Sequence, residues 1–429
     1  MTQDGVTIWL GMDWADQKHR WALRVEGQSR IQQGELEHTP EAMEQFVSSL
    51  AWQFPGQRVA VALEQSRGAL LFLLGKYAHL ILYPLHPNMV NHYRKSVYPS
   101  GAKSDPSAAA LILDLLYKHP ERLRPFQPDT AETRTLQLLV EARREAVDDK
   151  TRFLNRLTAQ LKMFFPQVLD WFSTIDTAVV GQLLQKWPTL DELKRTSADK
   201  IAAFLRKHRL TDSRIAALQQ LIQQSVVAIR DTAVLESSVL IVRRLVRQIE
   251  ILRESIADHD KRIAEWAEAH PDYGIFSSLP GAGPAMTPRL IAAFGTQRER
   301  YATASAIQCY AGIAAVTESS GKQKWVHWRW ACPKFLRQTF HEWAWLSTRK
   351  SAWARIFYDQ QRGRNKSHHA AVRALSFKWL RIVFRCWKDR VPYEEARYVL
   401  ALQKRTAPKG VEIRLKTSAG FAQVEGVSC

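Results

Sequence analysis

The chain has 429 residues, enough for two or three domains with a sizeable core. Hydrophobic residues make up 46% and charged residues 24%, which excludes a collagen-like or wholly disordered protein. No apolar run reaches the length of a transmembrane helix, and the first residues lack the signals of a secretory leader. The four cysteines are far apart and form no metal-ligand pattern, so we expect free thiols. Together these features predict a cytoplasmic protein without a membrane partner.

The charge of the chain is unevenly distributed. Lysine and arginine total 61 against 42 acidic residues, a formal net charge of +19. Positions 320–416 alone hold 23 basic and 6 acidic residues. Such an excess favours nucleic acid as the partner, ahead of an anionic membrane or a merely solubilising surface. The same region holds eight of the fifteen tryptophans: Trp325, Trp328, Trp330, Trp343, Trp345, Trp353, Trp379 and Trp387.

The N-terminal part alternates strand and helix signals. Strands are predicted at 7–12, 19–26, 29–37, 59–63 and 80–83. A helix opens at Thr39-Pro40, with threonine as the cap and proline in the first turn. Another helix is predicted over about 68–79, and a last one follows Asp105. This order of three strands, helix, strand, helix, strand and helix is that of the RNase H-like α/β fold.

Three acidic residues stand at matching points of this predicted fold. Asp13 and Glu64 each end an apolar strand, and Asp105 begins the last helical element. Carboxylates brought together in this way can hold two Mg²⁺ ions about 4 Å apart, which stabilise both oxygens of a phosphodiester displacement. Each acid also has a plain alternative: Asp105 before Pro106 is a good helix cap, Asp13 could merely close a strand, and Glu64 could be a buried ion-pair partner. Taken jointly, the three acids favour a metal site.

The middle of the chain is predicted to be helical. Positions 131–163 and 235–268 carry long apolar repeats, and the second follows alternating steps of three and four residues. His259 fills one gap in that repeat and is interpreted as a packing residue. The two segments could pair within one chain or between subunits. Shorter helices are expected over 166–234, where we identify no chemistry.

A glycine-rich turn opens the C-terminal region. Gly281 and Gly283 lie in the sequence Leu-Pro-Gly-Ala-Gly-Pro, just before an apolar helical run. Such a turn can present backbone N–H groups to a phosphate, as in helix-hairpin-helix modules. A plain tight turn is the alternative.

Residues 324–330 mix basic side chains with tryptophans. Interleaved cations and aromatic rings suit phosphate contact together with stacking on unpaired bases. The alternative is a tryptophan-rich core, and no neighbouring residue marks Ser319 or Ser320 as a nucleophile. The nucleic-acid contacts that we predict are Gly281, Gly283, Lys322, Lys324, Trp325, Trp328, Arg329, Trp330, Lys334 and Arg337.

One known family shows the same features in the same order. These are the three acids, the long helical pair, the glycine-rich turn and the Ser319-Ser320-Gly321 block. The chain is similar over about residues 7–400 to the DEDD-type transposases of the insertion-sequence one-ten family, whose relatives include the Piv-type DNA invertases. The resemblance implies a RuvC-like catalytic domain and a second domain that bears a serine. It further implies a recombinase that a structured bridge RNA guides and that joins donor and target double-stranded DNA as an oligomer, dimer or tetramer.

The resemblance also assigns roles to residues. Asp13, Glu64 and Asp105 would bind Mg²⁺, and Ser320, with Ser319 as the fallback, would attack DNA and become linked to it. The family's fourth aspartate falls at position 108, which is Ala108 here. Asp114 lies about 180° further around the helix and is a poor substitute. We therefore expect impaired catalysis with binding retained.

Two other functions remain open at this stage. A RuvC-like structure-specific endonuclease would use the acids with water and no serine, and a catalytically dead RNA- or DNA-binding protein would use neither. The expected organisation is a RuvC-like domain over 1–125, a helical coiled-coil region over 126–270, a serine-bearing domain over 271–410 and a flexible tail over 411–429. We expect the protein to be prokaryotic and associated with the nucleoid.

Overall fold

The computed structural model describes residues 6–64, 68–97 and 106–406. The chain divides into two compact units, residues 1–128 and 129–429.

The first unit is built on a five-stranded mixed sheet with the order β3-β2-β1-β4-β5. Strands β1, β4 and β5 run parallel, while β2 and β3 are antiparallel to their neighbours. The mixed α/β class predicted for this part is confirmed. The strands are β1 (Ile8–Asp13), β2 (Lys18–Val25), β3 (Gln32–Glu37), β4 (Val59–Leu63) and β5 (Leu80–Pro84).

Helices cover both faces of this sheet. Helix α1 is capped by the hydroxyl of Thr39, as predicted, and packs with α2 over one face. Helix α2 is shorter than the predicted 68–79 because it ends at Gly75. The helices of this unit are α1 (Pro40–Gln53), α2 (Ala69–Leu74), α3 (Pro87–Val97) and α4 (Pro106–Lys118), with a 3-10 turn η1 at Pro120–Arg122.

Helix α4 lies directly against β1 on the other face of the sheet. A Cβ atom on Gly11 would stand 2.4 Å from both the carbonyl oxygen of Ala109 and the backbone nitrogen of Leu113, so only glycine permits this approach. Further along, Tyr117 packs edge-on against Trp9, with ring centroids 5.0 Å apart. Later residues of the helix therefore meet earlier residues of the strand. It follows that α4 runs antiparallel to β1 and directs its N-terminus toward the Asp13 end.

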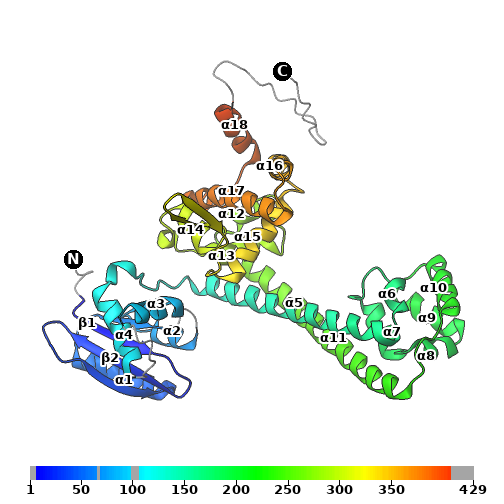
Figure 1. The fold of residues 1–429 in the computed structure, drawn as a ribbon, viewed down its shortest axis with the longest axis horizontal. Helices are drawn as coiled ribbons and strands as arrows, with labels where there is room; N and C mark the ends of the chain where they lie inside the picture. Colours follow the sequence, from blue (N-terminus) through cyan, green and yellow to red (C-terminus); the bar gives the residue numbers. More distant parts are fainter. Residues whose placement is uncertain (1–5, 65–67, 98–105, 407–429) are drawn as a thin grey trace. The chain divides into compact units, whose positions relative to one another are not determined.

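Two long helices run through the second unit (Figure 1). They are α5 (Ala131–Phe164) and α11 (Thr232–Glu268), and they pack against each other within the one chain. Arg143 of α5 makes two hydrogen bonds to Asp260 of α11, at 2.5 and 3.1 Å. His259 donates to the carbonyl of Ser255 at 2.7 Å, one turn back in its own helix. The predicted apolar seam is thus engaged, at least in part, inside the chain.

Five short helices close over one end of this pair. We call residues 166–231 the helical tip; its core is built from apolar side chains of all five helices and of the adjoining ends of α5 and α11. Asp176 joins both long helices, accepting from Lys150 at 2.6 Å and from Arg253 at 2.9 Å. The helices are α6 (Gln167–Trp171), α7 (Ala178–Lys186), α8 (Leu190–Arg195), α9 (Ala198–Lys207) and α10 (Asp212–Gln224).

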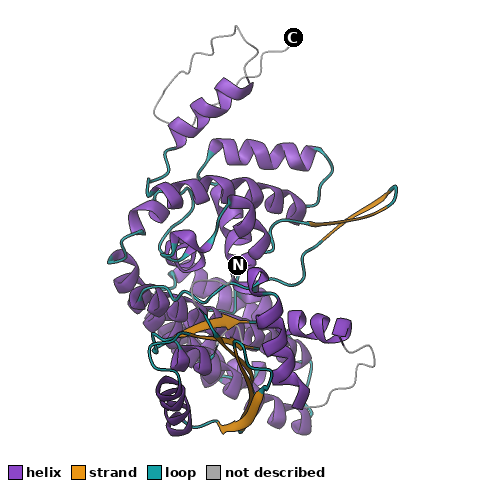
Figure 2. Cartoon of the chain, turned by 90° about the vertical axis from the view of Figure 1, so that its left-hand side faces the viewer, coloured by secondary structure: helices purple, strands orange, loops and turns teal. Residues whose placement is uncertain are grey.

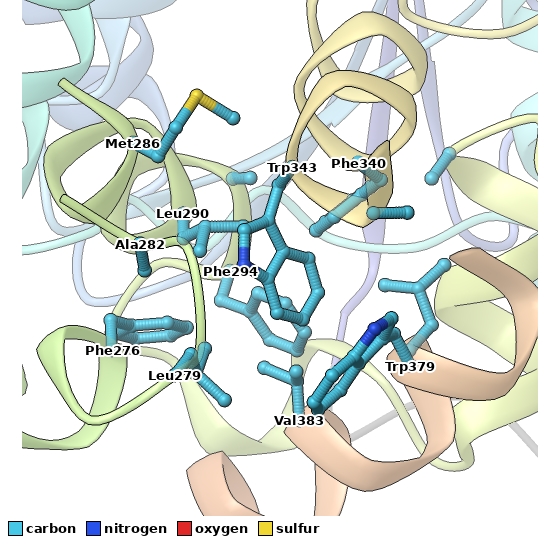
Figure 3. Close-up of a cluster of buried hydrophobic side chains, with 14 of the residues drawn as sticks. Phe276, Leu279, Ala282, Met286, Leu290, Phe294, Phe340, Trp343, Trp379 and Val383 are labelled. Atoms are coloured by element: carbon cyan, nitrogen blue, oxygen red, sulfur yellow. The ribbon is translucent and has the colours of Figure 1, made fainter. Parts of the chain in front are cut away.

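The opposite end of α5 and α11 belongs to a second helical core. Trp343, Trp379 and Trp387 are fully buried there, and Figure 3 shows Trp343 and Trp379 beside Phe294 and Phe340. Trp353 is only 7% exposed. The tryptophans at 343, 353, 379 and 387 therefore serve core packing, whereas Trp325 and Trp330 of the basic stretch are exposed. The helices are α12 (Tyr273–Ser277), α13 (Met286–Phe294), α14 (Ala304–Tyr310), α15 (Lys334–Ser347), α16 (Ala352–Gly363), α17 (His368–Asp389) and α18 (Glu395–Thr406), with a 3-10 turn η2 at Arg298–Arg300.

A β-hairpin projects from this helical core (Figure 2). Its strands are β6 (Val316–Ser320) and β7 (Gln323–His327), joined by the two-residue turn Gly321-Lys322. Nine of its ten strand residues are exposed, so neither face packs on the rest of the described chain. The sequence pattern did not predict these strands, because a ribbon exposed on both faces has no apolar alternation.

Candidate functional site

Asp13 and Glu64 lie side by side at one end of the sheet. Met12 pairs with Leu63 in the parallel register of β1 and β4, and each acid is the next residue along its strand. Neighbouring strands are about 4.8 Å apart, so the two carboxylates can reach a common ion. Both side chains are half-buried. Oxygen donors in this arrangement fit a hard divalent cation such as Mg²⁺.

The third predicted acid, Asp105, lies outside the described residues. The described part of α4 begins at Pro106, and its direction brings its N-terminus toward Asp13. Ala108, in the first turn, is 4% exposed and offers no ligand atom. Asp114 accepts a hydrogen bond from Tyr93 at 2.7 Å and pairs with Lys118 at 3.0 Å, so it is engaged elsewhere on the helix.

A buried histidine fixes the loop that follows Asp13. The amide of Ala15 donates to Nδ1 of His19 at 3.2 Å, so Nε2 carries the proton and donates to Nδ1 of His38 at 2.8 Å. Burial, and then the neighbouring His38, lower the pKa of His19 to about 4. His19 is therefore neutral at neutral pH and holds the loop through both ring nitrogens.

The register of the hairpin separates the two candidate serines. Ser320 pairs with Gln323 and Glu318 pairs with Trp325, which places all four on one face. Ser319 pairs with Lys324 and therefore faces the other side. Ser320 is the last strand residue before the turn, where Gly321 has a φ of +56°. Both serines are exposed.

Glu318 and His327 form a pair on the face that carries Ser320. Nε2 of His327 lies 2.8 Å from the Glu318 carboxylate, and Nδ1 lies 3.1 Å from the carbonyl of Trp328. Both ring nitrogens thus face acceptors, which favours the imidazolium form. The hydrogen bond to Glu318, followed by that to Trp328, raises the pKa of His327. Sequence reasoning missed this pair, because only strand pairing brings the two residues together.

The glycine-rich turn is packed differently at its two glycines. Gly281 has a φ of +77°, and a Cβ there would lie 2.8 Å from the carbonyl carbon of Leu346, so it fits closely against the end of α15. Gly283 is exposed, and its carbonyl accepts from the amides of Met286 and Thr287. The turn therefore serves packing at Gly281 and offers a surface only at Gly283.

The remaining predicted contacts fall into two groups. Trp325 and Trp330 are 50% and 79% exposed, and Lys322, Lys324 and Lys334 are exposed as well. By contrast, Arg373 and Arg337 lie over the ring of Trp328, at 4.2 and 5.2 Å from its centroid. Arg329 and Arg337 are half-buried, and the carbonyl of Arg329 accepts from Arg337. The exposed group alone presents rings and charges ready for a ligand.

Two segments of the chain match known family models. Residues 10–166 match a model described as "Transposase", and residues 273–359 match one described as "Transposase IS116/IS110/IS902 family". The first match covers nearly all of the sheet and the whole of α5, and the second covers the glycine-rich turn and the hairpin. The helical tip lies between the two matched segments.

Curated relatives align with nearly the whole chain. The protein named "Mini-circle putative transposase for IS117" of Streptomyces coelicolor is 24% identical, over 92% of this chain and 98% of its own length. A 42 kDa protein of insertion element IS900 of Mycobacterium paratuberculosis is 25% identical, over 91% of this chain and 98% of its own length. A 43.6 kDa protein of insertion element IS110 of Streptomyces coelicolor is 24% identical, over 92% and 96%. The similarity thus extends across both units.

Proposed function

Because the chain belongs to the IS116/IS110/IS902 family of insertion-sequence transposases, we propose that it is an RNA-guided DNA recombinase that cuts and rejoins donor and target DNA. The observation that carries the proposal is the placement of Asp13 and Glu64 at the same end of adjacent parallel strands. This is the position from which carboxylates act together on a phosphodiester.

The carboxylates act on the phosphate under attack. Asp13, Glu64 and Asp105 would hold Mg²⁺, which when bound supplies charge stabilisation for the phosphodiester oxygens. The family's RuvC-like, RNase H-like fold for this domain is consistent with the strand order of the sheet. Ala108 leaves the ligand set one carboxylate short of the four-acid pattern, so cleavage by this chain is weak or absent while nucleic-acid binding persists.

Ser320 is the nucleophile in this proposal. Its hydroxyl oxygen forms a bond to phosphorus as the bond between phosphorus and the oxygen of the departing strand breaks. The hydroxyl proton passes to a nearby carboxylate, which acts as the general base. Ser320 shares its hairpin face with the Glu318 carboxylate, whereas Ser319 faces Lys324. This difference supports Ser320 over Ser319.

The nucleic-acid partners are a structured bridge RNA and two DNA duplexes, held by a homo-oligomer. Support comes from the charge of the C-terminal region and from the exposed Trp325 and Trp330. Among the described residues, no helix is long and apolar enough to cross a membrane. Light scattering of the RNA-bound protein measures the oligomeric state, and we expect a dimer or a tetramer.

The test compares the unaltered chain with three variants. RNA that co-purifies with the protein is sequenced, and each protein is given this RNA and a DNA duplex that matches it. We expect no cleavage by the chain as it stands, Mg²⁺-dependent cleavage by Ala108→Asp, and loss of cleavage in Ala108→Asp with Ser320→Ala. Ala108→Asp with Ser319→Ala is the matched control and retains cleavage. Denaturing gels with and without protease reveal a protein-linked strand.

Each other result selects a different function. Cleavage by Ala108→Asp that ignores Ser320 and leaves no protein-linked strand identifies a RuvC-like endonuclease that uses water. Binding without cleavage in every variant identifies a nucleic-acid-binding protein without catalysis. Full recombination by the unaltered chain shows that the fourth carboxylate is dispensable.

A further inference from the structure

The helical tip contains a basic hollow between α7 and α9. It lies outside both segments that match family models, and the sequence pattern indicated no chemistry there. No carboxylate is among the side chains that line it in the described chain. The lining consists of Gln182, Gln185, Lys186, Lys200, Ala203, Phe204 and Lys207.

Four other cations of the tip, unlike the lysines of the hollow, are held by partners within the described chain. Elsewhere Lys194 donates to the carbonyls of Gln223 and Ser225, and Arg206 pairs with Asp212 at 3.0 Å. Arg195 pairs with Asp191 in the same way, and Arg214 donates to the carbonyl of Trp171.

Lys200 and Lys207, by contrast, are exposed and make no ion pair or hydrogen bond within the described residues. Lys186 is exposed as well and lies over aromatic rings instead of beside an acid. The charges of the hollow are therefore left for a ligand.

The floor of the hollow is aromatic and fixed. Phe204 packs edge-on against the buried Trp187, with ring centroids 5.2 Å apart. The Lys186 ammonium lies 4.5 Å from the Trp187 ring centroid and 5.7 Å from that of Phe204. Gln185 donates to the carbonyl of Arg243 in α11, which ties α7 to the long helix. The lysines thus stand on a rigid surface.

The spacing of the lysines suits a chain of phosphates. Lys200 and Lys207 are seven residues apart on α9, two turns along one face, which corresponds to about 10 Å at 1.5 Å per residue. One strand of a duplex advances about 3.4 Å per nucleotide, so the two lysines span about three nucleotides.

We propose that this hollow is a second nucleic-acid site, which binds the phosphate backbone of one strand through Lys186, Lys200 and Lys207. The amide of Gln182, which is exposed, lies beside the lysines and can bind sugar or base edges. The proposal rests on the nucleic-acid binding in the proposed function and not on its catalytic step. It gives the helical tip a role as a separate grip on the guide RNA or the DNA.

The test replaces the three lysines in the full chain: Lys186→Gln, Lys200→Gln and Lys207→Gln together. Binding is measured over a range of salt concentrations, with a stem-loop RNA and a DNA duplex as separate probes. The logarithm of the binding constant falls linearly with the logarithm of the salt concentration. Each lost phosphate contact makes this negative slope shallower by about 0.9 on duplex and about 0.7 on single strands, so we expect the slope to be shallower by about 2–3 on the preferred probe. The probe whose slope changes identifies whether the site takes RNA or DNA.

The matched control removes three exposed lysines elsewhere: Lys76→Gln, Lys162→Gln and Lys261→Gln. This variant has the same net charge, and its slope should change by less than one. In the unaltered protein, amine-reactive labelling should be reduced by the bound probe at Lys186, Lys200 and Lys207 and unchanged at the control lysines. Circular dichroism melting checks that both variants fold.

Equal slopes for the two triple variants on both probes, or unchanged labelling in the hollow, would overturn the proposal. The proposed function is tested separately by Lys322→Gln with Lys324→Gln at the hairpin. If that variant loses binding while the hollow variant does not, the proposed function stands and the second site is wrong. If the hollow variant alone loses binding, the second site stands and the hairpin interface is wrong.

Discussion

The two sets of candidate catalytic groups stand on very different β structure. Asp13 and Glu64 end strands whose other residues are buried on both faces, and α4 clamps one of those strands. Ser320 ends a strand that is exposed on both faces, in a hairpin that extends away from the helices (Figure 2). The sheet therefore positions its acids before any ligand binds. An isolated two-stranded ribbon is marginally stable, so the serine needs a partner to hold it in place.

The first prediction tests the close packing of α4 against β1 in the sheet. Gly11→Ala places a methyl group 2.4 Å from backbone atoms of α4, which cannot move as a flexible side chain could. We expect the first unit to lose about 3 kcal/mol of stability, the upper part of the usual range for overpacking. Urea unfolding followed by circular dichroism measures the loss.

Gly274→Ala is the control for this substitution, because a Cβ there meets no atom within 4 Å. It should unfold at nearly the same urea concentration as the unaltered chain. A Gly11→Ala protein with unchanged stability would mean that α4 does not seat on β1 as described.

The second prediction compares the two regions through their histidines. The pKa of His19 is lowered to about 4 in the folded protein against 6.5 when unfolded, so the unfolded state binds the proton first as pH falls. The first unit should lose about 2 kcal/mol of stability between pH 7 and pH 5, and His19→Gln should flatten this dependence. Urea unfolding at each pH measures it.

His327 should behave in the opposite way, because its pKa is raised. The stabilisation contributed by protonated His327 is fully present below its unfolded-state pKa of 6.5 and is lost as pH rises through the folded-state pKa. Ring resonances in NMR should therefore show His19 titrating near 4 and His327 above 6.5. Titration of both rings at the same pH would remove the contrast.

The third prediction concerns an exposed ring of the hairpin. Trp325→Ala should leave thermal stability unchanged, because the side chain is 50% exposed and lies outside both helical cores of the second unit. Binding to single-stranded nucleic acid should weaken by at least about 1 kcal/mol if a base stacks on the ring. Fluorescence anisotropy measures the affinity, and Trp325→Phe should recover most of it. A large fall in melting temperature would show that the ribbon packs on the protein.

The smallest effect is expected at the tip of the hairpin. Gly321 has a φ of +56° with open space around it, so Gly321→Ala costs about 1 kcal/mol through the backbone alone. The cost should appear as faster amide exchange in β6 and β7, with no change in global stability. Gly321→Asn, which tolerates this conformation, should exchange more slowly than Gly321→Ala. Equal exchange in both would mean that the turn does not limit the ribbon.

The sheet could be predicted because its signals are local. The run from Val59 to Leu63 is apolar without interruption and ends at an acid, and the observed strand has the same bounds. Thr39-Pro40 is a complete helix start within two residues, and the helix begins there. Each of these elements is decided by residues adjacent in the chain.

The hairpin face and the tryptophan core depend on contacts between distant residues. Trp379 donates to Ser347, 32 positions away, so its place in the core depends on a contact between distant residues. The pairing of Glu318 with His327 depends on a two-residue turn that no apolar pattern marks. For the same reason, the apolar repeat of α11 does not by itself identify α5 of the same chain as its partner.

Helices α5 and α11 run out from the C-terminal core and back to it. Leu136 and Val140 near the start of α5 share that core with Ile263 and Ala267 near the end of α11. The polypeptide therefore leaves the C-terminal core and returns to it at nearly the same place. The far ends of α5 and α11 and the helical tip between them have a core of their own. Because the two ends of this segment meet, its length can change without altering the path of the chain through the C-terminal core.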